Sequence, residues 1–377
     1  MLKFYYNRGF VVIEIIDKKL KGFTFIDLFA GIGGFRLAME SHGARCVYSS
    51  EWDKDARDVY NKNFGDMPHG DITKIDENTV PSHDILCAGF PCQAFSISGK
   101  QRGFEDSRGT LFFDVARIIK CKKPKVILLE NVKNFATHDG GRTMEVVKST
   151  LTQLGYSFYS SILNAMDYGI PQKRERIFMV CFRDDLGVAR DEYSIIRNDL
   201  DIIRNNLETR HFSFPKPFKL TRHVEDFLLQ DENLIKDLWS TRNDIVINKH
   251  NLDECSNTKS IRVGTVGKGG QGERIYSTKG IAITLSAYGG GVFAKTGGYL
   301  IGDKVRKLHP RECARLMGFP DSYRLHSNKN KAYQQLGNSV VVDVVQMIAG
   351  QLGEVLNVYK KLEFDANDFE IFVSAVG

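Results

Sequence analysis

The sequence predicts an α/β fold with a doubly wound, mostly parallel sheet and a second, smaller, loop-rich domain. Between Phe23 and Arg183, apolar runs suited to strands alternate with amphipathic runs suited to helices, a pattern typical of βαβ units. The first unit turns through the glycine cluster of DLFAGIGG, where the backbone can pass close to a ligand. After about Asp184 the composition becomes polar and then glycine-rich, which indicates a second domain.

The composition is that of an ordinary globular protein. The chain has 377 residues, 42% hydrophobic and 26% charged, enough for one large and one small domain. The apolar run VVIEII is interrupted by Glu14 and surrounded by charges, so we expect no signal peptide and no membrane span. Seven scattered cysteines without a CxxC pair predict neither a disulfide framework nor a metal site, and they fit a reducing cytoplasm.

Strands and helices are expected to alternate along the large domain. A strand, a glycine turn and a helix are expected over 23–43, then a strand over 46–52 and a helix over 53–64. Later strands are expected over 83–89, 125–132 and 176–182, and later helices over 110–121 and 141–154. This order predicts a sheet whose parallel strands end at one common edge.

The second half of the chain is expected to leave the large domain and return to it. Two prolines in SFPKPF indicate a connector, glycines between 263 and 298 indicate short strands with loops, and helical periodicity resumes after 310. We therefore expect a large domain of residues 1–213 and 338–377, a small domain of 226–309 and a hinge of 310–337. The acidic tail after Lys361 is expected to have little order.

Positive charge is concentrated in one segment. Residues 259–331 carry 14 Lys and Arg against 4 Asp and Glu, within a chain whose net charge is only +6. A basic segment on a mildly acidic body indicates a polyanionic partner. The alternative is a solvated basic face that has no partner.

The glycine cluster has the spacing GxGG over 31–34, which differs from the GxGxxG of pyrophosphate sites. Glu51 ends the next strand, where an acid can accept hydrogen bonds from ribose, and Trp52 beside it offers a flat face to adenine. Asp71 could reach the amine of the base. Together these residues favour a nucleoside cofactor without phosphates, S-adenosylmethionine being the obvious choice. The alternative is a glycine turn that has only a packing role and binds no cofactor.

The two cysteines of CAGFPCQAFS are expected at different places in the fold. Cys87 lies inside the expected strand and should be a buried apolar residue, whereas Cys92 follows that strand at the carboxyl edge of the sheet, where a thiol could act as a nucleophile. Glu130 ends the neighbouring strand, so it should lie near Cys92, and a buried carboxyl there could donate a proton. Asn131 could hydrogen-bond the loop that carries Cys92. Taken alone, a Pro-Cys pair is more often structural, and Glu130 could be a surface charge.

Arg174 and Arg176 in PQKRERIF are spaced to lie on one face of a strand. Near the crevice they could hold a phosphate and a base carbonyl. The alternative is a solvated sheet edge.

The segments FAGIGG, GFPCQ, ENV, QKRER and LGNSV, in this order, resemble the C5-cytosine DNA methyltransferases from about residue 25 to residue 356. Five motifs in a fixed order are far more specific than any one of them. The resemblance implies the S-adenosylmethionine-dependent methyltransferase fold and a DNA (cytosine-5-)-methyltransferase that yields 5-methylcytosine and S-adenosylhomocysteine, without a metal. Residues 264–300 and the KLHPRECARLMGFPDSY that follows look like the target-recognition region of a member that methylates the inner cytosine of GCGC.

The resemblance also implies roles for individual residues. Cys92 would attack C6 of cytosine, and Glu130 would stabilise or supply the proton at N3. Arg176 would hold O2, and Arg174 would contact a phosphate. Expected cofactor contacts are Phe29, Gly31, Ile32, Gly34, Glu51, Trp52, Asp71, Ile72, Gly89, Pro91, Leu111, Asn338 and Ser339. The expected DNA contacts are Gln271 and Ser98, which fill the space left by a flipped base, Arg274, which reads a guanine edge, and Arg262, Thr284, Ser286 and Tyr288.

The partners follow from the same resemblance. We expect double-stranded DNA as the substrate, a monomer, no membrane, a bacterial cytoplasm with nucleoid association through DNA, and a restriction-modification role with a separate endonuclease. Two alternatives remain, a catalytically inactive DNA-binding member and an RNA cytosine methyltransferase. The intact PCQ, ENV and QKRER motifs argue against the first, and the large glycine-rich domain argues against the second. The N-terminal segment, residues 187–210 and the acidic tail depart from the compact members of the family without breaking a motif.

Overall fold

The computed structural model describes residues 2–7, 10–15, 18–91, 111–188 and 211–376, and it describes side chains for 18–91, 111–188, 211–248 and 250–360. Cys92 and Ser98, two of the residues singled out in the sequence, lie outside the described residues.

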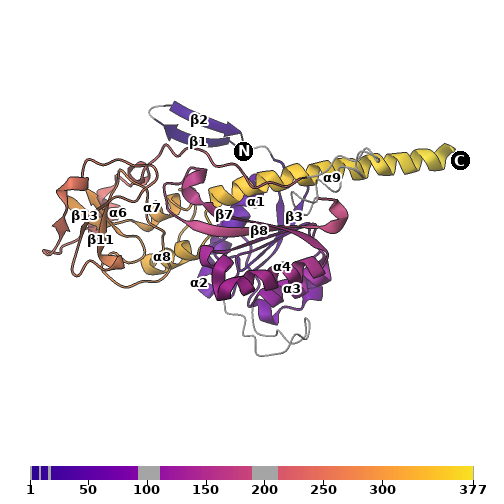
Figure 1. The fold of residues 1–377 in the computed structure, drawn as a ribbon, viewed down its shortest axis with the longest axis horizontal. Helices are drawn as coiled ribbons and strands as arrows, with labels where there is room; N and C mark the ends of the chain where they lie inside the picture. Colours follow the sequence, from indigo (N-terminus) through magenta and orange to yellow (C-terminus); the bar gives the residue numbers. More distant parts are fainter. Residues whose placement is uncertain (1, 8–9, 16–17, 92–110, 189–210, 377) are drawn as a thin grey trace.

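A six-stranded sheet forms the centre of the large unit (Figure 1), in the order β4-β3-β5-β6-β8-β7. Its strands are β3 (Thr24–Leu28), β4 (Arg45–Ser50), β5 (Ile85–Ala88), β6 (Val126–Val132), β7 (Tyr156–Asn164) and β8 (Glu175–Arg183). The pairs β3–β4, β3–β5 and β5–β6 are parallel, whereas β8 runs antiparallel to both β6 and β7. The expected mostly parallel sheet is confirmed, and the antiparallel β8 brings its first residues to the edge where β5 and β6 end.

Helices cover both faces of this sheet (Figure 1). On one face, α1 (Gly34–Ser41) packs beside α9 (Val342–Val376), and on the other lie α3 (Leu111–Lys122) and α4 (Arg142–Gln153). Alternate strand residues enter two separate cores, for example Phe25 in one and Ile26 in the other, as the two-residue period of a strand requires. The helix α2 (Lys54–Phe64) begins at Asp53, whose side chain accepts a hydrogen bond from the Ala56 N–H.

A second sheet of five strands makes the small unit, in the order β13-β12-β11-β10-β9. Its strands are β9 (Val246–Ile247), β10 (Arg262–Thr265), β11 (Arg274–Ser277), β12 (Gly298–Ile301) and β13 (Lys304–Lys307). It has a core of its own, formed by Ile261, Val263, Val266, Ile275, Phe293 and Val305. Tyr276, Leu285 and Tyr299 instead join the core of the large unit, so the two units are packed together.

Short helices connect and flank these elements. The chain from the small sheet returns through α7 (Pro310–Arg315) and α8 (Lys329–Asn338), and the buried Cys313, Met317 and Leu336 belong to the large core. The remaining short helices are α6 (Glu232–Ile235), η1 (Ile72–Lys74), η2 (Glu77–Thr79), η3 (Lys133–Gly141), η4 (Ala165–Tyr168), η5 (Asp184–Leu186), η6 (Val224–Phe227), η7 (Lys236–Leu238), η8 (Lys249–Asn251) and η9 (Gln271–Glu273).

The two ends of the chain form elements that we did not expect from the sequence. An antiparallel hairpin joins β1 (Leu2–Asn7) to β2 (Phe10–Ile15). The tail after Lys361, expected to have little order, continues α9 as helix to Val376 and projects beyond the body (Figure 1). Among the described residues one segment, Lys329–Lys360, has the length and hydropathy of a membrane span, but 67% of its apolar window is buried inside the protein, as in a core helix.

Candidate active site

Glu130 and Arg176 meet at the edge of the main sheet where β6 ends and β8 begins. Antiparallel pairing places Val132 opposite Arg176, so the two side chains come from neighbouring strands. The Nε of Arg176 lies 3.2 Å from Oε1 of Glu130, and both side chains are mostly buried. The sequence prediction that Glu130 and Arg176 share one sheet edge is confirmed.

The surroundings of Glu130 favour a neutral carboxyl. Burial raises the pKa of Glu130, and the positive charges of Arg176 and Arg174 lower it in part. A carboxyl whose pKa is raised holds its proton at a higher pH than an exposed glutamate does. Glu130 is therefore suited to donating a proton or a hydrogen bond to a ring nitrogen.

The chain that leads to Cys92 runs directly beside Glu130. Ala88, the last residue of β5, pairs with Leu129 of β6, and a Cβ added to Gly89 would lie 3.6 Å from Oε2 of Glu130. Asn131 donates from Nδ2 to the Phe90 carbonyl at 2.9 Å, as expected from the sequence. Gly89 and Phe90 are thus fixed next to Glu130, and Cys92 follows two residues later in the chain.

Cys87 lies where the strand pattern predicts it. Its side chain is buried in β5, with 0% of its surface exposed. Burial raises its pKa well above that of a free thiol. Cys87 therefore stays protonated and serves as a packing residue.

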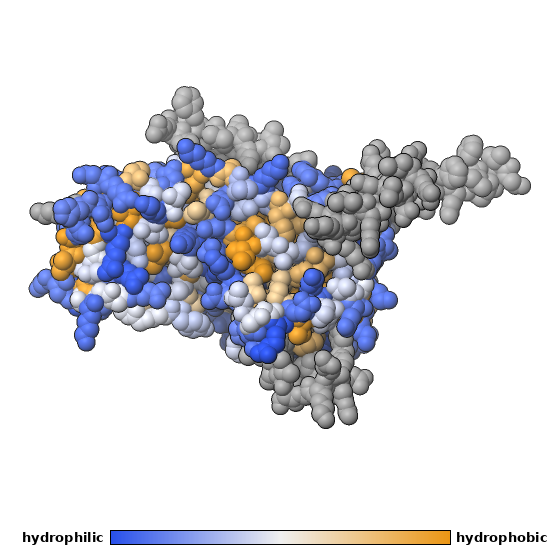
Figure 2. All heavy atoms as spheres, viewed as in Figure 1, coloured by the Kyte–Doolittle hydropathy of each residue, from blue (hydrophilic) through white to orange (hydrophobic). Residues whose placement is uncertain are grey.

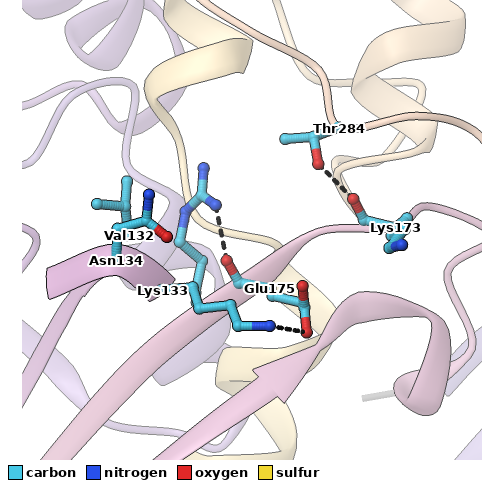
Figure 3. Close-up of a pocket in the computed structure, with 7 residues that line it drawn as sticks. Val132, Lys133, Asn134, Lys173, Glu175 and Thr284 are labelled. Carbon is cyan, nitrogen blue, oxygen red and sulfur yellow. Dashed lines mark hydrogen bonds and ion pairs between the residues drawn. The ribbon is translucent and has the colours of Figure 1, made fainter. Parts of the chain in front are cut away.

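A cavity of about 290 Å³ opens next to Arg176. It is lined by Val132, Lys133, Asn134, Lys173, Glu175, Arg176 and Thr284. Figure 3 shows Lys133 Nζ pointing toward the Glu175 carboxylate. These two atoms lie 2.8 Å apart, and Arg176 Nη1 donates to the Glu175 carbonyl at 2.8 Å. Three cationic side chains against one carboxylate give this cavity a positive potential, which suits an anionic group.

Arg174 has a different environment from the one we expected. Its side chain is only 2% exposed, and its guanidinium donates to the carbonyls of Leu285 (2.9 Å), Gly337 (2.8 Å) and Ser339 (2.7 Å). Burial and, to a smaller extent, the positive charge of Arg176 lower its pKa to about 9, against the opposing effect of Glu130. The two terminal nitrogens of Arg174 are therefore bonded to backbone carbonyls inside the protein, which does not favour the expected phosphate contact.

Gln172 is a buried connecting residue that the sequence interpretation missed. Its Nε2 donates to the Leu316 carbonyl at 2.7 Å, and its Oε1 accepts from the Leu285 N–H at 3.1 Å. Thr284 Oγ1 donates to the carbonyl of Lys173 (Figure 3). The segment before β8 therefore holds residues 284 and 285 of the small unit against the active site. A glutamine directly before two cations, Lys173 and Arg174, was the one available signal.

The glycine cluster wraps around Glu51 at the adjacent edge of the sheet. The Glu51 carboxylate is 7% exposed, and it accepts from the Gly31 N–H and the Asp53 N–H, both at 2.8 Å. Burial raises its pKa, and these N–H donors lower it in part. Phe29 and Gly31 have φ values of 55° and 54°, and a Cβ added to Gly31 would meet no atom within 4 Å. The turn thus leaves open space beside Glu51.

Trp52 and Asp71 lie near the same turn. The Glu51 N–H donates to the His69 carbonyl and the Ser50 hydroxyl to the Gly70 carbonyl, both at 2.8 Å, which brings Asp71 to this edge. Asp71 Oδ1 accepts from the Thr73 N–H and hydroxyl, and Ile72 is buried. Trp52 is 78% exposed, so its ring is available for stacking.

The start of α1 packs against the LGNSV segment. A Cβ added to Gly34 would lie 2.7 Å from Val340 Cγ2 and 2.8 Å from Ser339 Oγ, so only glycine allows this approach. Asn338 is exposed at the end of α8, and Leu111 is half-buried at the start of α3. An open turn, a buried carboxylate and an exposed indole fit a nucleoside cofactor such as S-adenosylmethionine.

Asp27 is a second residue that the sequence interpretation missed. It is fully buried in β3, just before the glycine cluster. Burial, opposed in part by the Arg36 cation, raises its pKa to about 8. An aspartate inside an otherwise apolar strand was the signal that could have identified it.

The expected DNA contacts of the small unit lie on its β10–β11 pair and on the glycine-rich loops. Gln271 and Arg262 are exposed, and Arg274 is half-buried at the start of β11. Tyr288 is 71% exposed, and its hydroxyl accepts from Gln334 Nε2 at 3.2 Å. Ser286 Oγ donates to the Tyr288 carbonyl. Hydrophilic side chains are spread over this unit on the face shown in Figure 2, which suits a charged partner.

Comparisons with known proteins agree with this geometry. A family model described as C-5 cytosine-specific DNA methylase matches residues 23–354. The Type II methyltransferase M.HhaI of Haemophilus parahaemolyticus is 61% identical over 346 residues, which are 92% of this chain and 99% of the relative. The Type II methyltransferase M.HaeII of Haemophilus aegyptius is 40% identical over 92% of this chain and 98% of its own length.

Solved structures with low sequence identity share the fold. The S. pombe Dnmt2 methyltransferase has a TM-score of 0.63 and 21% identity, over 89% of this chain and 99% of its own. A putative DNA modification methyltransferase from an E. coli prophage has a TM-score of 0.62 and 20% identity, over 89% of this chain and 100% of its own.

The match to the family model covers most of the chain, and the curated relatives are aligned over nearly their whole length. The expected mostly parallel sheet and the sheet-edge carboxyl are both present. The chain therefore belongs to the family of C-5 cytosine-specific DNA methylases and is a DNA (cytosine-5-)-methyltransferase.

Proposed function

We propose that this protein methylates C5 of the inner cytosine of GCGC in double-stranded DNA and that S-adenosylmethionine is the methyl donor. The observation that carries the proposal is the Glu130–Arg176 pair, with Nε and Oε1 3.2 Å apart, beside the chain that leads into Cys92. A carboxyl with a raised pKa and a cation on one sheet edge, with the Cys92 thiol directly after Pro91 in the sequence, match the needs of addition to a pyrimidine ring.

The proposed chemistry begins at Cys92. Its thiolate attacks C6 of the cytosine, and the electron pair of the C5–C6 bond moves toward C5 while Glu130 donates its proton, or a hydrogen bond, to N3. Arg176, held next to Glu130, hydrogen-bonds O2. When bound, S-adenosylmethionine supplies the methyl group that C5 takes, and it leaves as S-adenosylhomocysteine. A base then removes the C5 proton, the C6–S bond breaks, and Cys92 is released as the thiolate.

The residues proposed to hold the cofactor lie around one sheet edge. The turn at 29–34, with its open space at Gly31, faces the Glu51 carboxylate. We assign the hydrogen bonds with ribose to Glu51, stacking on adenine to Trp52, and the contact with the adenine amine to Asp71. The contact of Gly34 with Ser339 brings the 338–339 segment to the methionine end. Ile72, Gly89, Pro91 and Leu111 complete the proposed set.

The proposed DNA contacts other than Ser98, which is outside the described residues, belong to the small unit, and Thr284 lines the cavity next to Arg176. A cytosine inside a duplex is out of reach of a thiol, so the base must leave the stack at a cost of roughly a few kcal/mol. We assign the filling of that space to Gln271 and Ser98, and the reading of a guanine edge to Arg274. Arg262, Thr284, Ser286 and Tyr288 are assigned to the surrounding backbone and bases. The division into domains of 1–213 with 338–377 and 226–309 stays a proposal.

The relatives support the biological role. M.HhaI and M.HaeII are named Type II methyltransferases, and the GCGC target rests on the likeness of residues 264–300 to a recognition region for that site. We propose a monomeric cytoplasmic enzyme that protects DNA from a separate endonuclease.

The test is methyl transfer from labelled S-adenosylmethionine to three substrates, a GCGC duplex, a scrambled duplex of equal composition and an RNA of the same sequence. We expect label in the GCGC duplex alone, at C5 of the inner cytosine. Equal labelling of the two duplexes would overturn the target, labelling of RNA alone would overturn the substrate class, and labelling of none would overturn the activity.

Two thiol substitutions test the chemistry within that assay. Cys92→Ala should abolish transfer, because no other side chain is assigned to attack C6. Cys87→Ala should keep most of the activity, because Cys87 is buried and protonated. The reverse pattern would overturn the assignment of the nucleophile.

A further inference from the structure

Two glycine-rich loops of the small unit are in direct backbone contact. The first loop, residues 267–273, carries Gln271 and leads into Arg274, and the second loop, residues 286–291, carries Tyr288. A Cβ added to Gly272 would lie only 2.0 Å from the Gly290 carbonyl oxygen. A Cβ added to Gly291 would lie 2.7 Å from the Gly272 carbonyl oxygen. The loops can approach this closely only because both positions lack a side chain.

Hydrogen bonds fix this contact. The Phe293 N–H donates to the Gly272 carbonyl at 2.8 Å, and Phe293 is 2% exposed in the core of the small unit. The Ser286 N–H donates to the Lys295 carbonyl at 3.0 Å, which closes the base of the second loop. The first loop is thus held in place by the second loop and by the core beneath it.

The second loop is in turn held by Gln172 and Arg174, in the segment just before β8. Both backbone groups of Leu285 are held, the carbonyl by Arg174 at 2.9 Å and the N–H by Gln172 at 3.1 Å. A Cβ added to Gly337 would lie 2.3 Å from the Ala287 N atom, so α8 lies directly against the start of the loop. A continuous series of short contacts therefore joins the segment before Arg176 to Gly272.

We infer that Gly272 is a specificity-determining position: its backbone contact with Gly290 and Gly291 makes the two loops one rigid reading surface. Gln271 and Arg274 lie one and two residues from this contact, so the contact sets their distance from the second loop and from the active site. This inference rests on the proposed function. A methyl group at Gly272 separates the loops and misplaces those side chains, while the basic residues that bind phosphates remain.

The test compares two pairs of variants. Gly272→Ala is matched with Gly270→Ala, whose added Cβ would approach Glu273 no closer than 3.5 Å and whose φ is −60°. Gly291→Ala, at φ 103°, is matched with Gly289→Ala, at φ 151° and with 3.7 Å to its nearest atom. The readout is kcat/KM for the GCGC duplex divided by kcat/KM for duplexes with one base pair changed.

We expect Gly272→Ala and Gly291→Ala to lower this ratio by about 10- to 100-fold, the discrimination that one bidentate base contact provides. Gly270→Ala should stay within about 2-fold of the wild type. Gly289→Ala has backbone strain like Gly291→Ala but no overlap with Gly272, so it should lower the ratio less than Gly291→Ala does. Thermal unfolding and cofactor binding without DNA separate this effect from loss of fold, and two test positions keep the inference testable if one variant does not fold.

The outcomes are distinguishable from those of the proposed function. A wild-type enzyme that does not prefer GCGC overturns the proposed target. A wild-type enzyme that prefers GCGC, with an unchanged ratio in the folded Gly272→Ala or Gly291→Ala protein, overturns the role of the contact. An equal loss of the ratio in test and control variants also overturns it, because the backbone contact would then not be the cause.

Discussion

The pKa of Glu130 is set by two opposing effects. Burial raises its pKa, whereas Arg176, with Nε 3.2 Å from its carboxylate, and Arg174 lower it. The raised pKa extends the protonated form to higher pH, and the paired cation stabilises the carboxylate that remains after proton transfer. The same side chain can therefore give a proton and take it back during one turnover.

This balance predicts a pH dependence. The proton donor is present below the raised pKa of Glu130 and is lost as the pH rises through it, so the rate should fall on the alkaline side. Glu130→Gln, which keeps a hydrogen-bond donor but cannot titrate, should lower the rate by about 100-fold or more and remove that falling limb. Single-turnover methyl transfer at several pH values measures both effects.

Glu175→Gln provides the control, since it removes a carboxyl from the cavity next to Arg176 and leaves Glu130 in place. This variant should keep the alkaline decrease. If Glu130→Gln keeps the same decrease, then another group controls the rate at high pH.

Single residues differ in how far the sequence could predict them. The place of Glu130 at the carboxyl edge follows from the strand pattern, whereas its pairing with Arg176 also requires β8 to run antiparallel. The partners of Arg174 and Gln172 could not be predicted in this way, since Leu285, Leu316 and Ser339 are more than 100 residues away along the chain. A pattern of local spacing carries no information about such distant carbonyls.

Among the elements, α1 depends on a close approach at its first residue. Gly34 begins the helix and packs against Ser339 and Val340. The turn that precedes it therefore has its shape set by a segment more than 300 residues later in the chain. Cofactor binding at this turn should depend on that contact.

Gly34→Ala tests this dependence. The added methyl would overlap Val340 and Ser339, which should destabilise the fold by about 1–3 kcal/mol and weaken S-adenosylmethionine binding by about tenfold. Gly290→Ala, whose Cβ meets no atom within 4 Å, should leave both quantities unchanged. Denaturant unfolding and calorimetric titration give the two values, and unchanged cofactor affinity in Gly34→Ala would refute the coupling.

The elements also show where sequence patterns are weak. The strands β3, β5 and β6 are apolar runs, and the sequence predicts them well. The edge strand β7 (Tyr156–Asn164), rich in serine and half exposed, lacks such a run and was not predicted. The antiparallel direction of β8 could not be predicted either, because direction depends on pairing partners and not on local composition.

In the whole molecule, the large and small units are joined through a buried polar segment. Gln172, which is 0% exposed, bonds to Leu316 on one side and to Leu285 on the other. Each bond satisfies a backbone group inside the protein. Loss of the side-chain amide would leave both groups unpaired.

Gln172→Met should therefore lower the free energy of unfolding by about 2–5 kcal/mol, since two buried polar groups lose their partners. It should also raise the KM for DNA more than the Kd for the cofactor, because the hydrogen bond from Leu285, which holds the start of the second loop, is lost. Lys173→Met, at an exposed neighbouring position, should change the stability by about 0.5 kcal/mol or less. Equal effects of the two substitutions on unfolding would contradict the connecting role of Gln172.

The exposed ring of Trp52 has an optical consequence. The chain contains only two tryptophans, and the other, Trp239, is half-buried beneath the Arg306 guanidinium. The environments of the two indoles thus differ in polarity, and only Trp52 stands at the proposed adenine position. The intrinsic fluorescence of the unlabelled protein therefore contains a reporter of adenine stacking, which allows the rates of cofactor entry and exit to be followed without any engineered dye.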